Sequence, residues 1–311
     1  PWAPAAPAAP RAESGRYPRP SFEGFGEVLE LSSEPPVWLV RDFLSREDCA
    51  SLIEDGRTAV RPEKVYEGSF VVFDEDRLRP LLLLGPLCAA ATYSFREGDL
   101  AAAALALGAF AGAVLLLKEG LRWYMTSATA SGGKGGARFS GTKWQLCPPL
   151  PGEDPRGGAR GRLLERARLL CGVPSVSWLV PPTLTRYRRG EGQDAHVDSR
   201  ERPGVGAARA EREAFEAQGG QRVLQCLAYL NDVDAPQHGG HTCFHRGTLD
   251  GLRVRPEAGS ALVFCVSLAG GEEDLRMVHS AEALRGDVEK WVVPLWSLEG
   301  PHEEWAAWAD A

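Results

Sequence analysis

The sequence predicts a mainly β fold with flanking helices, in the α+β class, together with an inserted apolar helical segment. Two observations indicate this. Beyond Arg222, short apolar runs alternate with turn clusters such as PEAG and AGGEED, which is typical of a β sandwich or barrel. Residues 100–117 form an uncharged stretch that interrupts the chain. With 311 residues, 44% hydrophobic and 25% charged, the chain can bury a full core.

The N-terminal region is predicted to begin with a tail and to continue into the first elements of the main domain. Residues 1–20 contain six prolines and six alanines, which disfavour helix and strand, so we expect a disordered Pro/Ala-rich tail. Residues 37–53 have the pattern of a short apolar strand followed by a helix. Ser45 is its expected N-cap, and acidic residues follow in the first turn. We assign residues 37–76 to the start of the main domain.

Residues 77–125 form the predicted apolar helical insertion. As a helix, Leu100–Leu117 would be about 27 Å long, close to a hydrocarbon core of ~30 Å. Gly108 and Gly112 have the spacing that lets membrane helices approach closely. If the chain returns to one domain it must cross an even number of times, and the available partner, residues 80–93, is short for a span. Two interpretations stay open: a transmembrane helix within a membrane hairpin, or a soluble insertion with a buried, alanine-rich helix.

The remaining chain is predicted to form most of the main domain, over residues 126–298. Its Gly/Ser-rich stretches at 126–143 and 152–161 are expected to be loops, and residues 163–170 a helix. The predicted strands are 222–230, 241–246, 252–256, 260–268, 276–280 and 290–298. Residues 299–311 are expected to be a C-terminal tail.

Charge and cysteine content exclude some classes of function. A net charge of −7 and the lack of a basic run interleaved with aromatics make nucleic acid a poor partner. The seven cysteines form no C-x-x-C pair, so neither a disulfide framework nor a zinc knuckle is indicated. Localisation stays open between a membrane, such as that of the endoplasmic reticulum, and the soluble cytoplasm.

The motif of most chemical interest is His196-Val197-Asp198, which His279 follows 81 residues after the aspartate. On a strand, residues i and i+2 project from one face, so His196 and Asp198 can point to the same site. Two imidazoles and one carboxylate leave open positions on a bound metal, a pattern associated with Fe(II) oxygenases. The H-x-D pattern by itself is weak evidence because it is short.

A second group of metal-binding residue types lies at His238, His241, Cys243 and His245. A zinc site is one interpretation. Strand alternation and the Gly-rich turn at its start favour ordinary loop and strand histidines instead. For Arg222, a salt bridge and a substrate contact are both open.

Several segments resemble, in order and spacing, the prolyl 4-hydroxylase-like family of Fe(II)/2-oxoglutarate dioxygenases. They are YRRGEGQDAHVDS, QRVLQCLAYLNDV, GGHTCF, VRPEAGSALVF, and His279 followed by Lys290-Trp291. The resemblance covers residues 180–298 and extends weakly to 37–57. It implies a double-stranded β-helix, or jelly roll, and a catalytic role for the domain at 126–298.

The resemblance also implies the cofactors and residues of the site. It implies Fe(II), 2-oxoglutarate and ascorbate as cofactors, with His196, Asp198 and His279 as the catalytic iron ligands. It also implies four residues for binding 2-oxoglutarate. Lys290 would pair with the distal carboxylate, and Tyr229 would donate a hydrogen bond to that carboxylate. Trp296 would form a wall of the pocket, and Thr242 would line it.

The expected function is hydroxylation of an unactivated C–H bond with release of succinate and CO2, and peptidyl-proline 4-hydroxylation is the first expectation. Its partners would be O2 and a peptide or protein substrate, such as a proline-rich one, with membrane association through residues 100–117. The chain departs from the family at Gln193, where a tyrosine is common, and at His241, where glutamate is usual. The His279–Lys290 interval is one residue longer than is common. These departures keep open the same chemistry on another side chain or small molecule; a non-catalytic membrane-tethered binding module is the other alternative.

Overall fold

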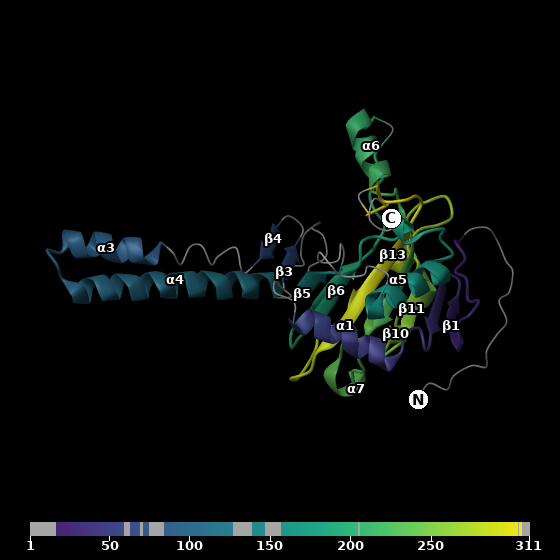
Figure 1. Ribbon diagram of the computed structural model, residues 1–311, viewed down its shortest axis with the longest axis horizontal. Coiled ribbons are helices and arrows are strands. Elements are labelled where there is room, and N and C mark those ends of the chain that lie inside the picture. The colour runs from purple at the N-terminus through teal and green to yellow at the C-terminus, as the bar shows by residue number, and fades with distance from the viewer. Residues whose placement is uncertain are drawn as a thin grey trace. The chain divides into compact units, whose positions relative to one another are not determined.

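The computed structural model divides into two compact units, one comprising residues 1–62 and 143–311 and the other residues 63–142. Figure 1 shows its helices and strands. The residues that the structure describes are 17–58, 63–68, 71–74, 84–126, 139–146, 157–204, 206–303 and 305–306.

The first unit is built on one long antiparallel sheet. Its strands are β1 (Val28–Ser33), β2 (Pro36–Val40), β5 (Phe139–Gln145, which begins in the second unit), β6 (Thr183–Tyr187), β7 (Gly192–His196), β8 (Arg222–Tyr229), β9 (Thr242–Phe244), β10 (Arg253–Val254), β11 (Ala261–Cys265), β12 (His279–Ala281) and β13 (Lys290–Leu298). Their order is β1-β2-β11-β8-β13-β6-β5-β7-β12-β9-β10. Neighbours in space are mostly distant in sequence, so the fold depends on long-range pairing.

The sheet curls back on itself. Phe264 lies on β11, third in the order, yet its ring centroid is 5.3 Å from that of Phe244 on β9, which is tenth. The Phe264 ring also lies 4.9 Å from the imidazole of His279 on β12. Strands so far apart in the order touch only if the sheet folds over into two facing parts. The structure thus confirms the predicted jelly roll with flanking helices.

Alternation along each strand separates an outer face from an inner face. On β8, Leu224, Cys226 and Ala228 point outward into the main hydrophobic core. Helices α1 (Arg46–Thr58) and α5 (Gly158–Cys171) cover this face, as Figure 1 shows. The inner face is left for side chains that line a site.

Local signals explain where the covering helices begin and end. The Ser45 hydroxyl accepts a hydrogen bond from the Asp48 amide at 3.0 Å, which confirms the predicted N-cap of α1. The Asp48 carboxylate in turn accepts from Arg162 Nε on α5 at 2.8 Å. Helix α5 ends at Gly172, whose φ of 66° is the left-handed conformation that favours glycine. The two helices are therefore joined to each other as well as to the sheet.

The remaining helical elements of the first unit are short and lie in its connections. They are α6 (Arg209–Ala217), α7 (Ala235–His238) and the 3-10 turns η3 (Val176–Trp178), η4 (Gly247–Leu249) and η5 (Leu275–Met277).

Five of the predicted strands lie where expected, and the differences have local causes. The first two residues of the stretch predicted as a strand over 276–280 belong to the turn η5, because the Asp274 carboxylate accepts from the Arg276 amide and caps that turn; β12 begins only at His279. Strand β5 falls partly in a segment predicted as a loop from its glycines and serines. Neighbouring strands supply its ladder partners, and such context outweighs composition. Residues 127–138 and 152–156 of the predicted loops lie outside the described residues.

Both predicted tails include residues that pack on the domain. Residues 1–16 lie outside the described residues, but the Tyr17 hydroxyl donates to the Asp274 carboxylate at 2.8 Å. At the other end, the Trp305 side chain is buried and its indole N–H donates to the Val176 carbonyl at 2.6 Å. Tyr17 and Trp305, which lie in the two predicted tails, therefore contact the main domain.

The second unit contains a strand pair and a helical hairpin. Strand β3 (Glu63–Gly68) pairs with β4 (Val71–Asp74), and helix α3 (Gly85–Phe95) packs along α4 (Leu100–Thr126). A Cβ at Gly85 would lie 2.9 Å from a Leu107 methyl group, so the helices approach closely there. Among the described helices, one segment, Leu100–Leu117, is long and apolar enough to cross a membrane, with a mean hydropathy of 2.4. Only 6% of this segment is buried, so the helix is not the buried, alanine-rich one of the second interpretation.

Candidate metal and cosubstrate site

His196, Asp198 and His279 converge on the inner face of the sheet. His196 and His279 stand directly opposite each other on β7 and β12, so their side chains share a face. Asp198 lies two residues beyond His196, after the strand has ended, and not on the strand as the sequence suggested. His196 Nε2 is 3.4 Å from Asp198 Oδ1, and His279 Nε2 is 3.5 Å from Oδ2. One ligand atom from each residue lies within 4.8 Å of the others.

Backbone carbonyls fix the orientation of both imidazoles. The Nδ1 atom of His196 is 2.7 Å from the Asp194 carbonyl oxygen, and that of His279 is 2.9 Å from the Met277 oxygen. Because a carbonyl only accepts, each Nδ1 carries the hydrogen, and in the neutral ring Nε2 keeps its lone pair. Both lone pairs point towards Asp198, which is the arrangement that a metal ligand requires.

Asp198 is held in place by Trp296 and Arg222, which lie on neighbouring strands. The indole N–H of Trp296 donates to Asp198 Oδ2 at 3.0 Å. Arg222 donates to the main-chain oxygen of Asp198 at 3.2 Å, and its guanidinium lies 4.3 Å from the centre of the Trp296 ring. Trp296, predicted as a wall of the cosubstrate pocket, therefore contacts a predicted iron ligand. For Arg222 a salt bridge and a substrate contact were both open. Its hydrogen bond goes to the main chain of Asp198 and holds that residue in place.

The charges of the triad suit a metal site. Burial by itself would raise the pKa of Asp198, but the nearby His279, His196 and Arg222 hold it well below its usual value. Burial lowers the pKa of His279 to about 4. At neutral pH the site therefore offers one carboxylate and a neutral His279. Cis ligands at ~2.1 Å from one ion lie ~3 Å apart, near the distances found here, so the residues fit an Fe(II) ion with open positions for other ligands.

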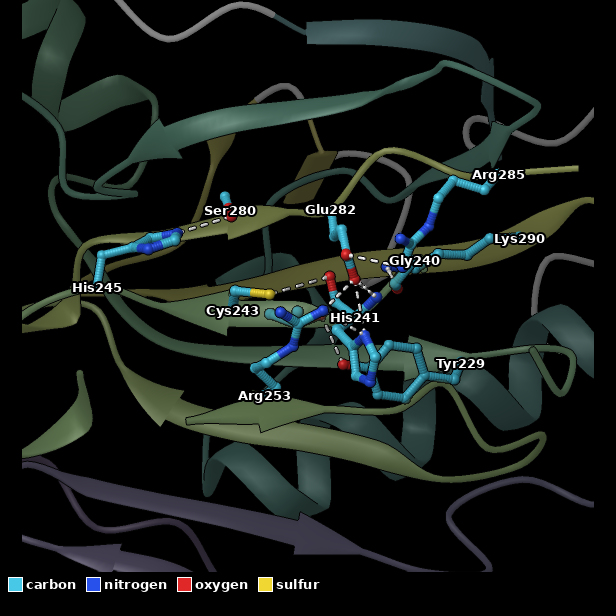
Figure 2. Close-up of polar contacts among 11 residues, drawn as sticks. Tyr229, Gly240, His241, Cys243, His245, Arg253, Ser280, Glu282, Arg285 and Lys290 are labelled. Atoms are coloured by element: carbon cyan, nitrogen blue, oxygen red, sulfur yellow. Dashed lines mark hydrogen bonds and ion pairs between the residues drawn. The ribbon is translucent and has the colours of Figure 1, made fainter. Parts of the chain in front are cut away.

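Lys290 lies on the same face of β13 as Trp296 and is 1% exposed. Its ammonium donates to the Gly240 carbonyl at 2.7 Å (Figure 2). Its Nζ lies 5.7 Å from the ring centres of Tyr187 and Tyr229. Burial lowers the pKa of Lys290 to about 8. Within the described part of the chain, no carboxylate forms an ion pair with it. A buried cation in this state fits an incoming anion such as the distal carboxylate of 2-oxoglutarate.

Two hydroxyl groups accompany this lysine. Tyr229 Oη and Thr242 Oγ1 are 2.8 Å apart, and both residues are 2% exposed or less. Lys290, Tyr229 and Thr242 were predicted to share one pocket, and the structure brings them together. Sequence reasoning missed Tyr187, which stands directly opposite Lys290 on β6. The alternating run TLTRY could have indicated that strand, but not its register against β13.

Gln193 shares the inner face with the triad because of a β-bulge. It is three residues from His196, an odd spacing that would turn it outward on a regular strand. Between β7 and β12 the register shifts, so His279 pairs with His196 and Ala281 pairs with Gln193. The extra residue in β7 therefore turns the side chain of Gln193 to the same face as that of His196. Thr242 also pairs with Ala281, from the other side, so Gln193 lies in the same row as the cosubstrate residues.

His241 directly precedes β9, and its place in the alternation puts it on the opposite, outer face. Figure 2 shows it with Glu282 and Arg253: its Nδ1 is 2.7 Å from Glu282 Oε2, which also accepts from Arg253 at 2.7 Å. The other two histidines of the predicted zinc alternative have separate partners, since His238 faces the carbonyl of Arg285 and His245 faces the hydroxyl of Ser280. In the described residues the triad is the one group of histidines, cysteines and carboxylates that could hold a metal. Ordinary loop and strand histidines are thus the better account.

Comparisons with known proteins point to the same class of site. Residues 182–298 match the family model described as the 2OG-Fe(II) oxygenase superfamily, which implies Fe(II) and 2-oxoglutarate. No curated protein sequence matches this chain closely enough to count as a relative.

Solved structures similar to this chain include three prolyl hydroxylases. A viral collagen prolyl hydroxylase from Paramecium bursaria Chlorella virus-1, in its 2OG complex, is 17% identical (TM-score 0.38) over 50% of this chain and 78% of its own. A Trichoplax adhaerens prolyl hydroxylase with a hypoxia-inducible-factor peptide is 16% identical (TM-score 0.34) over 51% and 63%. A Pseudomonas putida prolyl-4-hydroxylase is 14% identical (TM-score 0.34) over 80% and 98%.

Proposed function

We propose, from the membership of residues 182–298 in the 2OG-Fe(II) oxygenase superfamily, that this protein is a dioxygenase that 4-hydroxylates peptidyl proline. The single observation that carries the oxygenase chemistry is one inner face with two complementary ends. A histidine–aspartate–histidine cluster lies at one end, and a buried lysine without a carboxylate partner in the described chain lies at the other. Such a face suits a metal and a dicarboxylate bound together.

The residues of each end have distinct roles in this proposal. His196, Asp198 and His279 would hold Fe(II), and Lys290 would hold the distal carboxylate of 2-oxoglutarate. When bound, the iron and 2-oxoglutarate use O2 to hydroxylate a C–H bond with release of succinate and CO2. We further propose ascorbate as the reductant that keeps the iron ferrous, as the family resemblance implies.

The chain itself contributes orientation and a dry environment. Trp296 and the main-chain carbonyls hold the three metal-binding side chains in place. The rings of Phe264 and Phe244 lie 4.9 and 5.8 Å from the imidazole of His279 and shield that side of the site from water. Excluding water strengthens electrostatic interactions in the site and limits side reactions.

Proline as the target rests on the motif resemblance, and Gln193 favours a second candidate. Its amide stands where the family often has a tyrosine, on the inner face beside the metal-binding strand. An amide both donates and accepts hydrogen bonds, whereas a tyrosine adds a large ring. Hydroxylation of another amino-acid side chain or a small molecule is therefore the alternative.

A direct assay tests both levels of the proposal. The purified chain would be supplied with Fe(II), 2-oxoglutarate, ascorbate and proline-rich peptides, and both succinate and peptide oxidation would be measured by mass spectrometry. We expect coupled formation of succinate and hydroxyproline, which the His279→Ala variant loses. Succinate without hydroxyproline would exclude the proline assignment and keep the oxygenase. If the protein formed no succinate, either with added substrate or without it, the result would contradict the proposed oxygenase activity.

A further inference from the structure

We propose that the α3–α4 hairpin inserts into a lipid bilayer and tethers the first unit to a membrane. The proposal does not depend on the reaction that the first unit catalyses. It starts from the large apolar side chains that the hairpin leaves exposed. Among them, Phe95 is 88% exposed, Leu116 77%, and Leu100 and Leu105 74% each. A soluble protein rarely exposes apolar surface of this extent without a partner.

The directions of these side chains identify the partner as lipid. Leu115, Leu116 and Leu117 are consecutive on α4 and are 56%, 77% and 49% exposed. Consecutive residues of a helix point about 100° apart, so these three face in three different directions. A second copy of the chain or another protein would cover one stripe of α4 and leave the others in water. A bilayer surrounds an inserted helix and covers all of them.

The length of the apolar surface matches the bilayer interior. The uncharged stretch Leu100–Leu117 spans about 27 Å as a helix, against a hydrocarbon core of ~30 Å. Charged residues bound it on both sides: Arg96, Glu97 and Asp99 before it, and Lys118, Glu119 and Arg122 after it. A band of this length between two polar ends fits a membrane better than it fits a protein surface.

Two polar side chains of the hairpin have partners within it, which lowers their cost in hydrocarbon. At the start of α4, the Asp99 carboxylate accepts a hydrogen bond from the Ala102 amide at 3.0 Å. The Thr92 hydroxyl in α3 donates to the Cys88 carbonyl at 2.8 Å. The two helices run in opposite directions, and the chain on either side of residues 63–142 belongs to the same unit. A membrane hairpin of this kind returns to the side from which it entered, and α3, with 11 residues or about 16 Å, accompanies α4 over part of its length.

Vesicle flotation of the full chain tests the proposal. With neutral phosphatidylcholine vesicles, we expect the protein to float at both low and high salt, because the inserted band carries no charge. A Leu105→Lys, Leu116→Lys double variant should lower the floating fraction at least about tenfold, since a lysine in the centre of a membrane helix is costly. The matched control is Leu169→Lys on α5, where a leucine is also 44% exposed but lies outside the hairpin. It should float like the wild type.

Two results would overturn the proposal. One is wild-type protein that stays with the soluble fraction, whether as a monomer or as a discrete oligomer in sedimentation. The other is a double variant that floats as well as the wild type. The circular dichroism of each variant in detergent reports whether it has folded. Because flotation needs no turnover, a failure here leaves the proposed reaction untouched, and an inactive protein can still float.

Discussion

The two ends of the inner face differ in how their charges are balanced. At the metal end, the Asp198 carboxylate faces two imidazoles and an indole N–H, so each of these four groups has a partner. At the other end, the buried ammonium of Lys290 has one carbonyl and two aromatic faces but no carboxylate in the described chain. The metal end, with one negative charge, is suited to a cation. The lysine end is suited to an anion.

Because of this difference, substitutions at the two ends should affect ligand binding and protein stability differently. The metal end is held by its own hydrogen bonds before anything binds, whereas the lysine end carries an unrelieved desolvation cost that a bound carboxylate would offset. Changes at the two ends should therefore have effects of different kinds. The predictions below test this contrast.

The largest expected effect is at the metal end. His279→Ala removes one of the three converging ligand atoms, so turnover of 2-oxoglutarate should fall by more than the roughly 10- to 100-fold that loss of an outer partner costs. Fe(II) affinity should fall with it, as measured by calorimetry under anaerobic conditions. The matched control is His245→Ala, because His245 is exposed and hydrogen-bonds to Ser280 on the outer face. A similar loss in that control would contradict the assignment.

Lys290→Met changes the other end of the inner face. It should weaken binding of 2-oxoglutarate but should not lower the stability of the free protein. The affinity for 2-oxoglutarate should fall by about 2–5 kcal/mol, the usual consequence of truncating one partner of a buried charge pair. Without 2-oxoglutarate, denaturant unfolding should show the variant to be at least as stable as the wild type, because the desolvated charge is gone. Fe(II) affinity should change little. Loss of stability in the free protein would show that Lys290 has a structural role.

Trp296→Phe tests whether the indole positions the metal ligand. The ring is kept while the N–H that donates to Asp198 is lost. We expect a roughly 10- to 100-fold weaker Fe(II) affinity and a smaller change in the KM for 2-oxoglutarate. Electron paramagnetic resonance of Mn(II) bound in place of iron should also report the altered geometry. If the KM for 2-oxoglutarate changed more than the metal affinity, Trp296 would instead wall the cosubstrate pocket.

The smallest effect is a pH dependence that belongs to the lysine end. With a pKa lowered by burial to about 8, Lys290 loses its proton in the folded protein before it does in the unfolded chain. Stability should therefore be lowest below pH 8 and rise from there until the unfolded-state pKa is passed. Affinity for 2-oxoglutarate should fall up to about tenfold per pH unit above 8, since the neutral amine pairs poorly with a carboxylate. Both slopes should disappear in Lys290→Met; the nearby titratable groups Cys243 and Glu282 are unchanged in it.

Much of the site could be anticipated because its signals are local. Alternation with a period of two marks strands wherever one face is buried, and this placed five of the later strands. The short spacing of His196 and Asp198 brings both side chains to one place whether or not the strand continues. The Ser45 cap is likewise an interaction between residues three apart.

Other features could not be predicted because they depend on register between distant strands. The bulge that turns Gln193 inward, the pairing of Tyr187 with Lys290, and the outward position of His241 all follow from which residues face each other across β6, β7, β9, β12 and β13. A shift of one residue would reverse every face.

The sequence by itself determined the residue types of the site, most of the strands that carry them, and an uncharged helical segment of membrane-spanning length. Only the tertiary structure decided that Trp296 supports Asp198, that Lys290 is buried without a carboxylate partner among the described residues, and that 6% of Leu100–Leu117 is buried. The physical reason is that periodicity and capping are properties of neighbouring residues. Burial and pairing are properties of contacts between segments far apart in the chain.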